Sequence, residues 1–515
     1  MHAKIFSAIT HGVVAHSVEV EVDVSFGLVN FYIVGLPDTA IKESAKRVQS
    51  ALKNSGLPFP ARRVTVNLAP ADLKKVGTLF DLPIAIGILI AIDHVTIDQL
   101  FLSETLFIGE LSLDGSIRPV RGTLAIASDA MLLGKKRLIV PKENAAEAAL
   151  ICNLEVFSFN HLTELLSFLR AETVVLPTLA QNLDNSERVY NPSLDFGQVK
   201  GQQLAKRALQ ISAAGRHNIV LVGAPGSGKT MLAKRLPSIM PQMSFQETLE
   251  TTKIYSITGK LHNDGLVKSR PFRNPHHTIS QAGLIGGGSY PQPGEISLAH
   301  NGILFLDELT EFKRTTLEAL RQPLEDGEVV IARAQQVVKF PSNFLMVAAL
   351  NPCPCGFFGD KKRACSCSPQ HIAMYIQKLS GPLLDRIDLQ INVSSIEYND
   401  ATSLSSVGQS SADLFVSVLQ ALEWQKKRFG NDGTFNSTMS TDSIDKYCVL
   451  TPAAQLLMRK AFDRLLLSMR GYHKILKLAR TIADLDGSEL IDVAHAQEAT
   501  MYRSLDQFID RRKNL

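Results

Sequence analysis

The sequence has few of the features that would place it in a membrane or outside the cell. No apolar run in its 515 residues approaches the roughly 18 residues of a membrane-spanning helix. The longest such run, residues 82–92, is interrupted by Pro83 and Gly87 and is typical of a helix in a protein core. The first residues show no signal-peptide profile. We therefore expect a cytoplasmic protein with no membrane partner.

Cysteine and net charge are also scarce. Only six cysteines occur, four of them clustered, which favours a reducing compartment and a metal site over a framework of disulfides. A net charge of +4 neither requires nor excludes a nucleic-acid partner. The chain is too long for one hydrophobic core, so we expect about two to four domains.

A phosphate-binding motif is the most specific signal that is present. An apolar run at 219–222 is followed by a full G-x-x-x-x-G-K-[ST] sequence and then by a helical pattern, an order that a chance glycine-rich turn would not produce. The glycines allow backbone N–H groups to surround phosphate oxygens, Lys229 would reach the β- and γ-phosphates, and the Thr230 hydroxyl would bind Mg²⁺. The residues expected to contact ATP are Gly223, Ala224, Pro225, Gly226, Ser227, Gly228, Lys229 and Thr230.

Two further apolar runs end in polar side chains, as the strands of a nucleotide-hydrolysing site do. The first, from 303 to 306, ends in Asp307 and Glu308. Asp307 would complete the Mg²⁺ shell, and Glu308 would polarise the attacking water. The second run ends in Asn351, in the arrangement of an AAA+ sensor 1, which would orient that water. Either run alone is consistent with an ordinary buried strand, so this interpretation depends on the P-loop.

Two arginines in the C-terminal half are candidates for contacts with the nucleotide. The segment 381–388 contains Leu-Leu-Asp-Arg and resembles the arginine-finger segment of the AAA+ family. Arg386 would then enter the neighbouring subunit's site, and a closed ring would follow; a surface pair with a nearby aspartate is the alternative. Further on, Arg470 best fits the sensor 2 position of the same family, and Arg480 is its competitor.

Basic residues between and after these motifs suggest contacts with DNA. The segment between Lys229 and Asp307 alternates basic, aromatic and glycine-rich pieces, which is typical of a mobile loop that touches a phosphate backbone. Residues 327–340 predict a hairpin whose tip is either a DNA contact or a solvated turn. The candidate DNA contacts are Arg270, Arg273, Arg333 and Lys339.

Two Cys-x-Cys pairs, nine residues apart, come directly after Asn351. Four thiolates suit a closed tetrahedral Zn²⁺ site, but the spacing is tighter than the usual C-x₂-C, and reduced or redox-active thiols are the alternative. His371 is a candidate substitute ligand. The expected ligands are Cys353, Cys355, Cys365 and Cys367, whereas Cys152 and Cys448 are expected in the core.

The first 170 residues mix strands and helices without a regular βαβ alternation, which predicts an α+β domain. The segments 109–122 and 137–144 resemble the proteolytic domain of Lon proteases. Those enzymes use a serine and a lysine, and the matching positions here fall near Asp81 and Leu124, which cannot form a nucleophile and its base. The resemblance implies a Lon-like fold without peptidase chemistry.

Together these features predict a multidomain α/β protein. Its expected parts are a Lon-protease-like α+β domain at 1–170, a linker at 171–195, an AAA+ P-loop core at 196–392, a flexible connection at 393–412 and a helical lid at 413–515. The order of these parts resembles the YifB/ComM family of magnesium-chelatase-like AAA+ proteins. The cysteine run and the Gly-Pro-Leu-Leu-Asp-Arg segment make that resemblance specific.

The resemblance implies an ATP hydrolase that uses ATP and Mg²⁺, with Zn²⁺ as a further candidate cofactor. It implies a homo-oligomeric, hexameric ring that acts as a helicase on single-stranded and branched DNA and drives branch migration during natural transformation, with recombination proteins as partners. Spacing and composition alone indicate only a ring ATPase. The rivals are a chelatase motor, a protein-remodelling ATPase and a Lon-like peptidase. The fused N-terminal domain and the clustered cysteines argue against the first, and Asp81 and Leu124 against the last.

Overall fold

A computed structural model describes residues 1–179, 192–261, 265–288, 290–333, 336–360, 362–394, 409–431, 433–465 and 467–503. The chain divides into two compact units. The first comprises Met1–Glu187, Phe245–Lys268 and Ala334–Lys339, and the second comprises Arg188–Ser244, Ser269–Arg333 and Phe340–Leu515. The linker predicted at 171–195 lies partly outside the described residues, and the connection predicted at 393–412 lies largely outside them.

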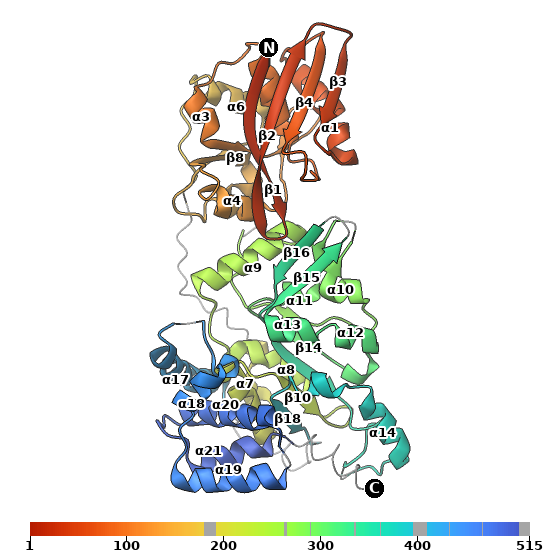
Figure 1. Ribbon diagram of the computed structural model, residues 1–515, viewed down its shortest axis with the longest axis vertical. Coiled ribbons are helices and arrows are strands. Elements are labelled where there is room, and N and C mark those ends of the chain that lie inside the picture. The colour runs from red at the N-terminus through yellow and green to blue at the C-terminus, as the bar shows by residue number, and fades with distance from the viewer. Residues whose placement is uncertain are drawn as a thin grey trace. The chain divides into compact units, whose positions relative to one another are not determined.

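A mixed seven-stranded sheet forms the centre of the first unit (Figure 1). Its strands, in spatial order, are β3 (Asn30–Val34), β4 (Arg63–Ala69), β2 (Val14–Ser25), β1 (His2–His11), β5 (Thr105–Phe107), β8 (Arg137–Pro141) and β9 (Glu155–Phe159). Strict alternation in β2 explains its place: Val18, Val20 and Val22 are fully buried, whereas Glu19 and Glu21 on the other face are partly exposed. A small hairpin of β6 (Glu110–Leu111) and β7 (Ile117–Arg118) accompanies this sheet.

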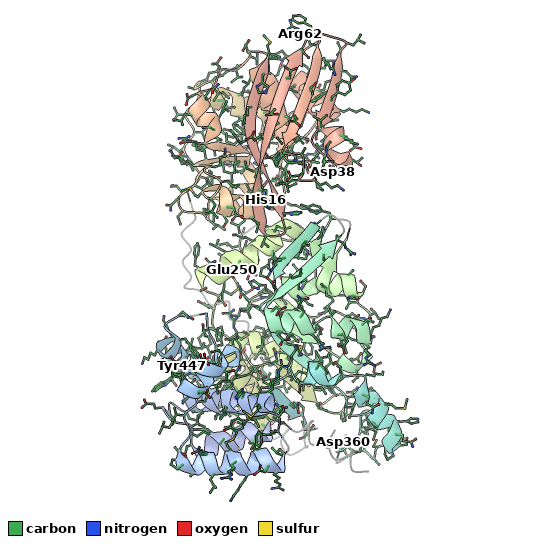
Figure 2. The ribbon with its side chains drawn as sticks, in the orientation of Figure 1. His16, Asp38, Arg62, Glu250, Asp360 and Tyr447 are labelled. Carbon is green, nitrogen blue, oxygen red and sulfur yellow. The ribbon has the colours of Figure 1, made fainter. Side chains whose placement is uncertain are left out.

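Helices cover this sheet. They are α1 (Thr39–Asn54), α2 (Asp81–Ala91), α3 (Gln99–Ser103), α4 (Thr123–Ala130), α5 (Ala145–Ala148) and α6 (Leu162–Leu169). Asp38, labelled in Figure 2, caps α1 by accepting the N–H of Ile41 at 2.9 Å. Helix α2 confirms the core helix expected at 82–92: Pro83 lies in its first turn, and a Cβ at Gly87 would come within 2.6 Å of Val22 Cγ2.

One helix of the first unit comes from a distant part of the sequence. Helix α9 (Phe245–Thr258) follows the P-loop helix in the chain, yet it packs against α4. Its Ser256 hydroxyl donates to the buried carboxylate of Glu147 at 2.9 Å, and the Asn144 amide donates to the same carboxylate at 2.6 Å. The N-terminal unit therefore includes a segment that the sequence analysis placed in the ATPase core.

The second unit is built on a parallel five-stranded sheet. Its strands, in spatial order, are β11 (Phe272–Arg273), β14 (Ile303–Leu306), β17 (Leu345–Leu350), β10 (Ile219–Val222) and β18 (Leu389–Asn392). Residues 219–222 and 303–306 are buried at every position, as expected of strands that are covered on both faces. Because all neighbours are parallel, the carboxyl ends of β14, β17 and β10 lie at one edge of the sheet.

The C-terminal helices share a hydrophobic core with this sheet. Val418 of α17, Ile475 of α20 and Ala496 of α21 belong to the same buried cluster as Leu209 of α7 and Leu221 of β10. The lid therefore packs directly on the ATPase core and forms the blue helical bundle in Figure 1. Its helices are α17 (Ser411–Phe429), α18 (Thr441–Tyr447), α19 (Pro452–Arg464), α20 (Met469–Leu485) and α21 (Val493–Met501).

The remaining elements of the second unit are short. They are α7 (Gln203–Gly215), α8 (Lys229–Arg235), α10 (Gln281–Ile285), β12 (Gly286–Gly287), β13 (Gln292–Pro293), α11 (Glu295–Leu298), α12 (Arg314–Glu318), α13 (Arg321–Asp326), α14 (Pro369–Gln377) and α15 (Gly381–Leu384). The predicted hairpin is present as β15 (Glu328–Arg333), which belongs to the second unit, and β16 (Gln336–Pro341), of which residues 336–339 are assigned to the first. Among the described helices, none combines the length and the hydrophobicity needed to cross a bilayer.

Candidate nucleotide-binding site

The P-loop joins β10 to α8, and its first residue, Gly223, has no room for a side chain. A Cβ at Gly223 would lie 2.4 Å from the Val393 carbonyl oxygen and 2.8 Å from Ser227 Oγ. Gly226 and Gly228 adopt positive φ angles of 78° and 92°, which glycine tolerates best. The Ser227 hydroxyl is buried and has no hydrogen-bond partner within the described part of the chain. This loop with a free buried hydroxyl, directly before a helix N-terminus, fits a phosphate group.

Lys229 and Asn351 meet at the end of the loop. The Lys229 ammonium donates to the carbonyl oxygens of Gly223 at 2.7 Å and Ala224 at 3.0 Å, and to Asn351 Oδ1 at 3.3 Å. Burial lowers the pKa of Lys229, whereas the nearby carboxylates of Asp307 and Glu308 act in the opposite direction. The ammonium is thus held by weak neutral acceptors, which phosphate oxygens can replace.

The two expected Mg²⁺ ligands are already side by side. Thr230 Oγ1 donates to Asp307 Oδ2 at 2.7 Å, which brings together a hydroxyl and a carboxylate oxygen, the hard ligands that Mg²⁺ prefers. Asp307 Oδ1 in turn accepts the backbone N–H of Glu308 at 3.0 Å. The structure therefore assembles Lys229, Thr230, Asp307 and Asn351 at one sheet edge, with residues that can bind the triphosphate and its metal ion.

Glu308 has a neighbour that the sequence analysis did not assign to the site. Its Oε2 lies 3.2 Å from Nδ1 of His277, and its backbone is left-handed, with φ at 51°. His277 follows β11, which pairs with β14 in parallel, so both side chains leave the sheet at the same edge. The Pro-His-His sequence just after β11 was the only feature of the sequence that could have pointed to His277. No local pattern predicts that β11 pairs with β14, and this pairing is what brings His277 to Glu308.

Arg386 lies at the amino-terminal ends of the strands, on the edge of the same sheet opposite the P-loop. It precedes β18, and its carbonyl accepts the Asn218 amide, just before β10, at 3.0 Å. The four residues of β10 separate this edge from the P-loop by about 13 Å. The Arg386 guanidinium donates to the Arg321 carbonyl at 3.1 Å and forms an ion pair with Glu325. The alternative pairing of Arg386 with Asp385 or Asp388 is not formed among the described residues, because Arg386 pairs with Glu325 instead.

Arg470 lies with Arg386 and away from the P-loop. Both residues line a cavity of about 540 Å³, and Arg470 Nη2 is 3.6 Å from the same Glu325. The Arg470 side chain is 53% exposed, so it can reach a partner outside its own chain. If Arg470 senses nucleotide, this position favours the nucleotide of a neighbouring subunit, as for Arg386.

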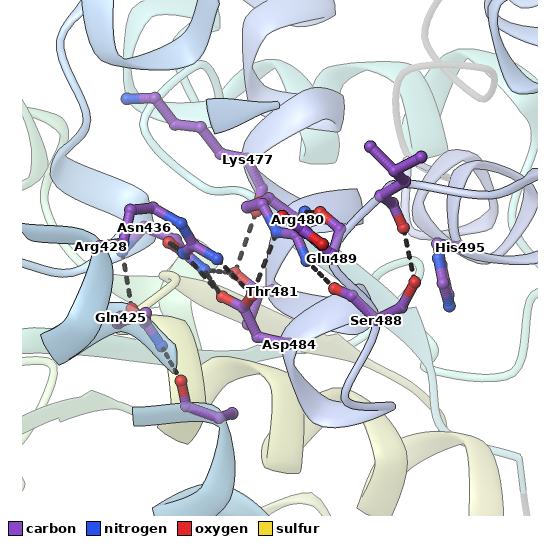
Figure 3. Close-up of polar contacts among 12 residues, drawn as sticks. Gln425, Arg428, Asn436, Lys477, Arg480, Thr481, Asp484, Ser488, Glu489 and His495 are labelled. Atoms are coloured by element: carbon purple, nitrogen blue, oxygen red, sulfur yellow. Dashed lines mark hydrogen bonds and ion pairs between the residues drawn. The ribbon is translucent and has the colours of Figure 1, made fainter. Parts of the chain in front are cut away.

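Arg480, the competitor of Arg470, has a structural role. It is 1% exposed and donates to Asp484 Oδ1 at 3.0 Å and to the Glu489 carbonyl at 2.6 Å (Figure 3). Asp484 also accepts from Arg428 at 2.6 Å, which connects α20 to α17. These contacts account for the Arg480 guanidinium inside the lid.

Of the four candidate DNA contacts, two are bonded to groups of their own chain and two are exposed. Arg270 donates to the carbonyls of Pro241 and Asn301, each at 2.6 Å, and Arg273 forms a bidentate pair with Glu295 at 2.6 and 2.7 Å. Both guanidinium groups therefore serve the local fold, and a DNA role for them stays a prediction without structural support. Arg333 and Lys339, on β15 and β16, are exposed. They remain the better candidates.

The four clustered cysteines converge. Their sulfur atoms all lie within 4.8 Å of one another. His371 is exposed at the start of α14 and does not belong to this cluster. Cys448 is buried as expected, but the expectation for Cys152 is wrong: it is exposed, because it lies in the turn between α5 and β9.

The two positions that the resemblance to Lon proteases aligned with the serine and the lysine hold buried side chains. Asp81 is fully buried, and Arg47 holds its carboxylate with bonds of 2.7 and 3.0 Å. Leu124 is fully buried in α4. Both residues serve the core of the first unit.

Comparison with known families assigns most of the chain. Residues 195–401 match the family described as magnesium chelatase, subunit ChlI, and residues 408–503 match its C-terminal family. Residues 20–144 match a further family described as subunit ChlI of Mg-chelatase. With the site geometry, these matches define a magnesium-chelatase-like AAA+ ATPase.

Individual relatives narrow this class. The chain is 43% identical to the competence protein ComM of Haemophilus influenzae over all of its own length and 99% of that protein. It is 41% identical to the uncharacterized protein YifB of Salmonella typhimurium over 97% of its own length and 96% of that protein. A shorter match, 29% identical over 29% of this chain and 28% of that protein, is to Lon protease 2 of Bacillus subtilis. The chain belongs to the YifB/ComM family of magnesium-chelatase-like proteins.

Proposed function

We propose that this chain is the subunit of a ring-forming, ATP-driven DNA translocase that promotes branch migration in recombination during natural transformation. The observation that carries the proposal is the identity over the whole chain to a protein named for competence. A match of this extent includes the N-terminal unit, and it therefore concerns more than the ATPase module. The matches to chelatase families support the ATPase and do not by themselves choose its substrate.

The site residues suggest how hydrolysis would proceed. Bound Mg²⁺ would supply charge neutralisation for the transferring phosphoryl group. Lys229 would exchange its carbonyl contacts for phosphate oxygens, and Thr230 and Asp307 would hold the metal. Glu308 would take up a proton from the attacking water, while Asn351, 3.3 Å from Lys229, would orient that water.

The position of Arg386 supports an oligomer. Its guanidinium lies at the sheet edge opposite its own P-loop, so a role in hydrolysis would be at a neighbour's site. The side chain is 10% exposed, so it would have to leave its ion pair with Glu325 to reach that site. Such a head-to-tail contact closes into a ring when the rotation between subunits allows it, and we propose a hexamer. The exposed Arg333 and Lys339 would contact the DNA backbone.

The decisive experiment measures steady-state ATPase rates with no DNA, single-stranded DNA, duplex DNA and a four-way junction. We expect stimulation by DNA that is lost in Lys229→Ala and Arg386→Ala proteins. Displacement of a labelled strand from the junction would then measure branch migration directly. An ATPase that no DNA stimulates would contradict the proposal.

A chelatase motor is the second candidate, because the ATPase and lid regions both match magnesium-chelatase families. The same assay with a porphyrin and free Mg²⁺ in place of DNA separates the two. Stimulation by the porphyrin alone would favour the chelatase, and stimulation by DNA alone would favour the translocase. A response to neither would favour a protein-remodelling ATPase.

A further inference from the structure

The four clustered sulfur atoms lie close enough to bind one metal ion. Cys353 Sγ lies 3.3 Å from Cys355 Sγ and 3.7 Å from Cys365 Sγ, and Cys355 Sγ lies 3.5 Å from Cys365 Sγ. Tetrahedral Zn²⁺ with Zn–S bonds of about 2.3 Å would place its sulfur ligands about 3.8 Å apart. All four thiols are free, so no disulfide competes for these sulfur atoms.

Backbone N–H groups point at the sulfur atoms. The N–H of Cys355 donates to Cys367 Sγ and the N–H of Cys367 donates to Cys365 Sγ, each at 3.4 Å. Bonds of this kind stabilise thiolate charge and orient metal ligands. Soft thiolate sets without other donors select Zn²⁺, Cu(I) or iron–sulfur clusters, and the four-sulfur set at tetrahedral spacing suits Zn²⁺.

The segment has no regular secondary structure among its described residues and only a small apolar core. Of the described residues in 352–368, none belongs to a helix or strand. Its small apolar cluster has only four fully packed members, Cys353, Ile372, Tyr375 and Ile376. A bound metal ion would hold a loop with so small a core in one conformation.

The cysteine segment follows Asn351 in the chain, packs on the P-loop through Gly356, and shares an apolar cluster with Tyr375 of the following helix α14. Asn351 is two residues before Cys353. Gly356, between the two cysteine pairs, packs on the P-loop: a Cβ there would lie 2.6 Å from Pro225 Cδ and 3.9 Å from Asn351 Cγ. Tyr375, in the same apolar cluster as Cys353, accepts a hydrogen bond from Thr310, which follows Glu308 by two residues.

We propose that Cys353, Cys355, Cys365 and Cys367 bind a Zn²⁺ ion. The ion would fix the segment 352–368, which follows Asn351 and packs on Pro225 of the P-loop, so that metal occupancy sets the rate of ATP hydrolysis. The cysteines are positioning residues, because they act through Asn351 and Pro225. The inference rests on the ATP-hydrolysis part of the proposed function and is independent of DNA.

Metal content and ATPase kinetics test this together. Untagged full-length protein, purified with a phosphine reductant, is analysed for zinc, iron and copper by inductively coupled plasma mass spectrometry. We expect about one zinc per chain and its loss in a Cys355→Ser/Cys367→Ser protein. In DNA-free assays kcat should fall about tenfold or more in this variant. Its KM for ATP should change by less than about threefold, because Lys229 and Thr230 have no cysteine contact in the described structure.

Two glycine variants separate metal binding from its effect on the site. Gly356→Ala and Gly359→Ala both place alanine at positive φ, 85° and 80°. Among the described residues, only the Cβ at 356 meets other atoms within 4 Å, at Pro225 and Asn351. We expect both proteins to keep their zinc and only Gly356→Ala to lose kcat. Absence of zinc, another metal in its place, or a parental kcat in the cysteine variant would overturn the inference. Failure of DNA to stimulate the ATPase would affect only the proposed function.

Discussion

At the scale of single residues, His277, which follows β11, contacts Glu308, the carboxylate that we propose as the base. The separation of 3.2 Å allows the imidazole to donate to the carboxylate and set its orientation. His277→Ala should lower kcat about tenfold with little change in KM, because ATP contacts remain. Glu308→Gln, which removes the base itself, should lower kcat about hundredfold or more. Steady-state ATPase assays measure both.

His276 provides the control for this prediction. Its ring bonds to Thr278 at 2.9 Å and packs on the His277 ring, with the ring centroids 4.1 Å apart, but it has no contact with Glu308 in the described structure. His276→Ala should therefore hydrolyse ATP near the parental rate. Equal losses in the two histidine variants would show that His277 acts only through the local fold, and a parental rate in Glu308→Gln would exclude Glu308 as the base.

Two arginines on α20 should separate stability from activity. Arg480→Ala leaves Asp484 with one cation fewer in a buried network and should lower the free energy of unfolding by about 3–5 kcal/mol. Arg470→Ala removes an exposed side chain and should leave stability within about 0.5 kcal/mol while it lowers ATPase activity. Urea unfolding and ATPase rates measure the two effects. A stable Arg480→Ala protein with defective ATPase would reverse these roles.

At the scale of elements, Asp388 connects the sheet to the lid. Its carboxylate lies 2.9 Å from Lys474 of α20 and 3.1 Å from His217, at the amino ends of β18 and β10. Burial acts to raise the pKa of Asp388, but Lys474 and His217 outweigh it and hold that pKa well below its ordinary value. The contribution of Asp388 to stability is therefore complete above the unfolded pKa of about 4 and is lost as pH falls toward the folded value.

Asp388→Asn should accordingly lower the free energy of unfolding by about 1–3 kcal/mol at pH 7. The difference from the parental protein should shrink below about pH 4, where the parental carboxylate begins to lose its advantage. Urea unfolding between pH 7 and pH 3 measures it, and the exposed neighbour Asp385, changed to Asn, is the control. A difference that stays constant over this range would show that charge plays no part.

Local patterns predicted most of the elements that hold the site. A short run of apolar residues predicts a buried strand, and the residue that follows the run, Asp307 or Asn351, lies at the end of that strand. The P-loop is likewise a local motif, so all three features can be read from a few consecutive residues. The contacts that escaped prediction are between distant segments. The position of α9 against α4, the meeting of His277 with Glu308 and the shared cavity of Arg386 and Arg470 all depend on strand order and packing, which no local pattern contains.

At the scale of the whole molecule, the proposed division of the active site between subunits would make two inactive variants complementary. Lys229→Ala removes the phosphate contact but keeps Arg386, and Arg386→Ala keeps the P-loop but removes the arginine that would act on a neighbour. Each protein alone should be inactive. Equal random mixing pairs an intact P-loop with an intact arginine at roughly a quarter of interfaces, so about a quarter of the parental ATPase rate should return. Mixing Lys229→Ala with the double variant should restore nothing. If the first mixture also stays inactive, Arg386 does not act across an interface, and the closed ring loses its structural support.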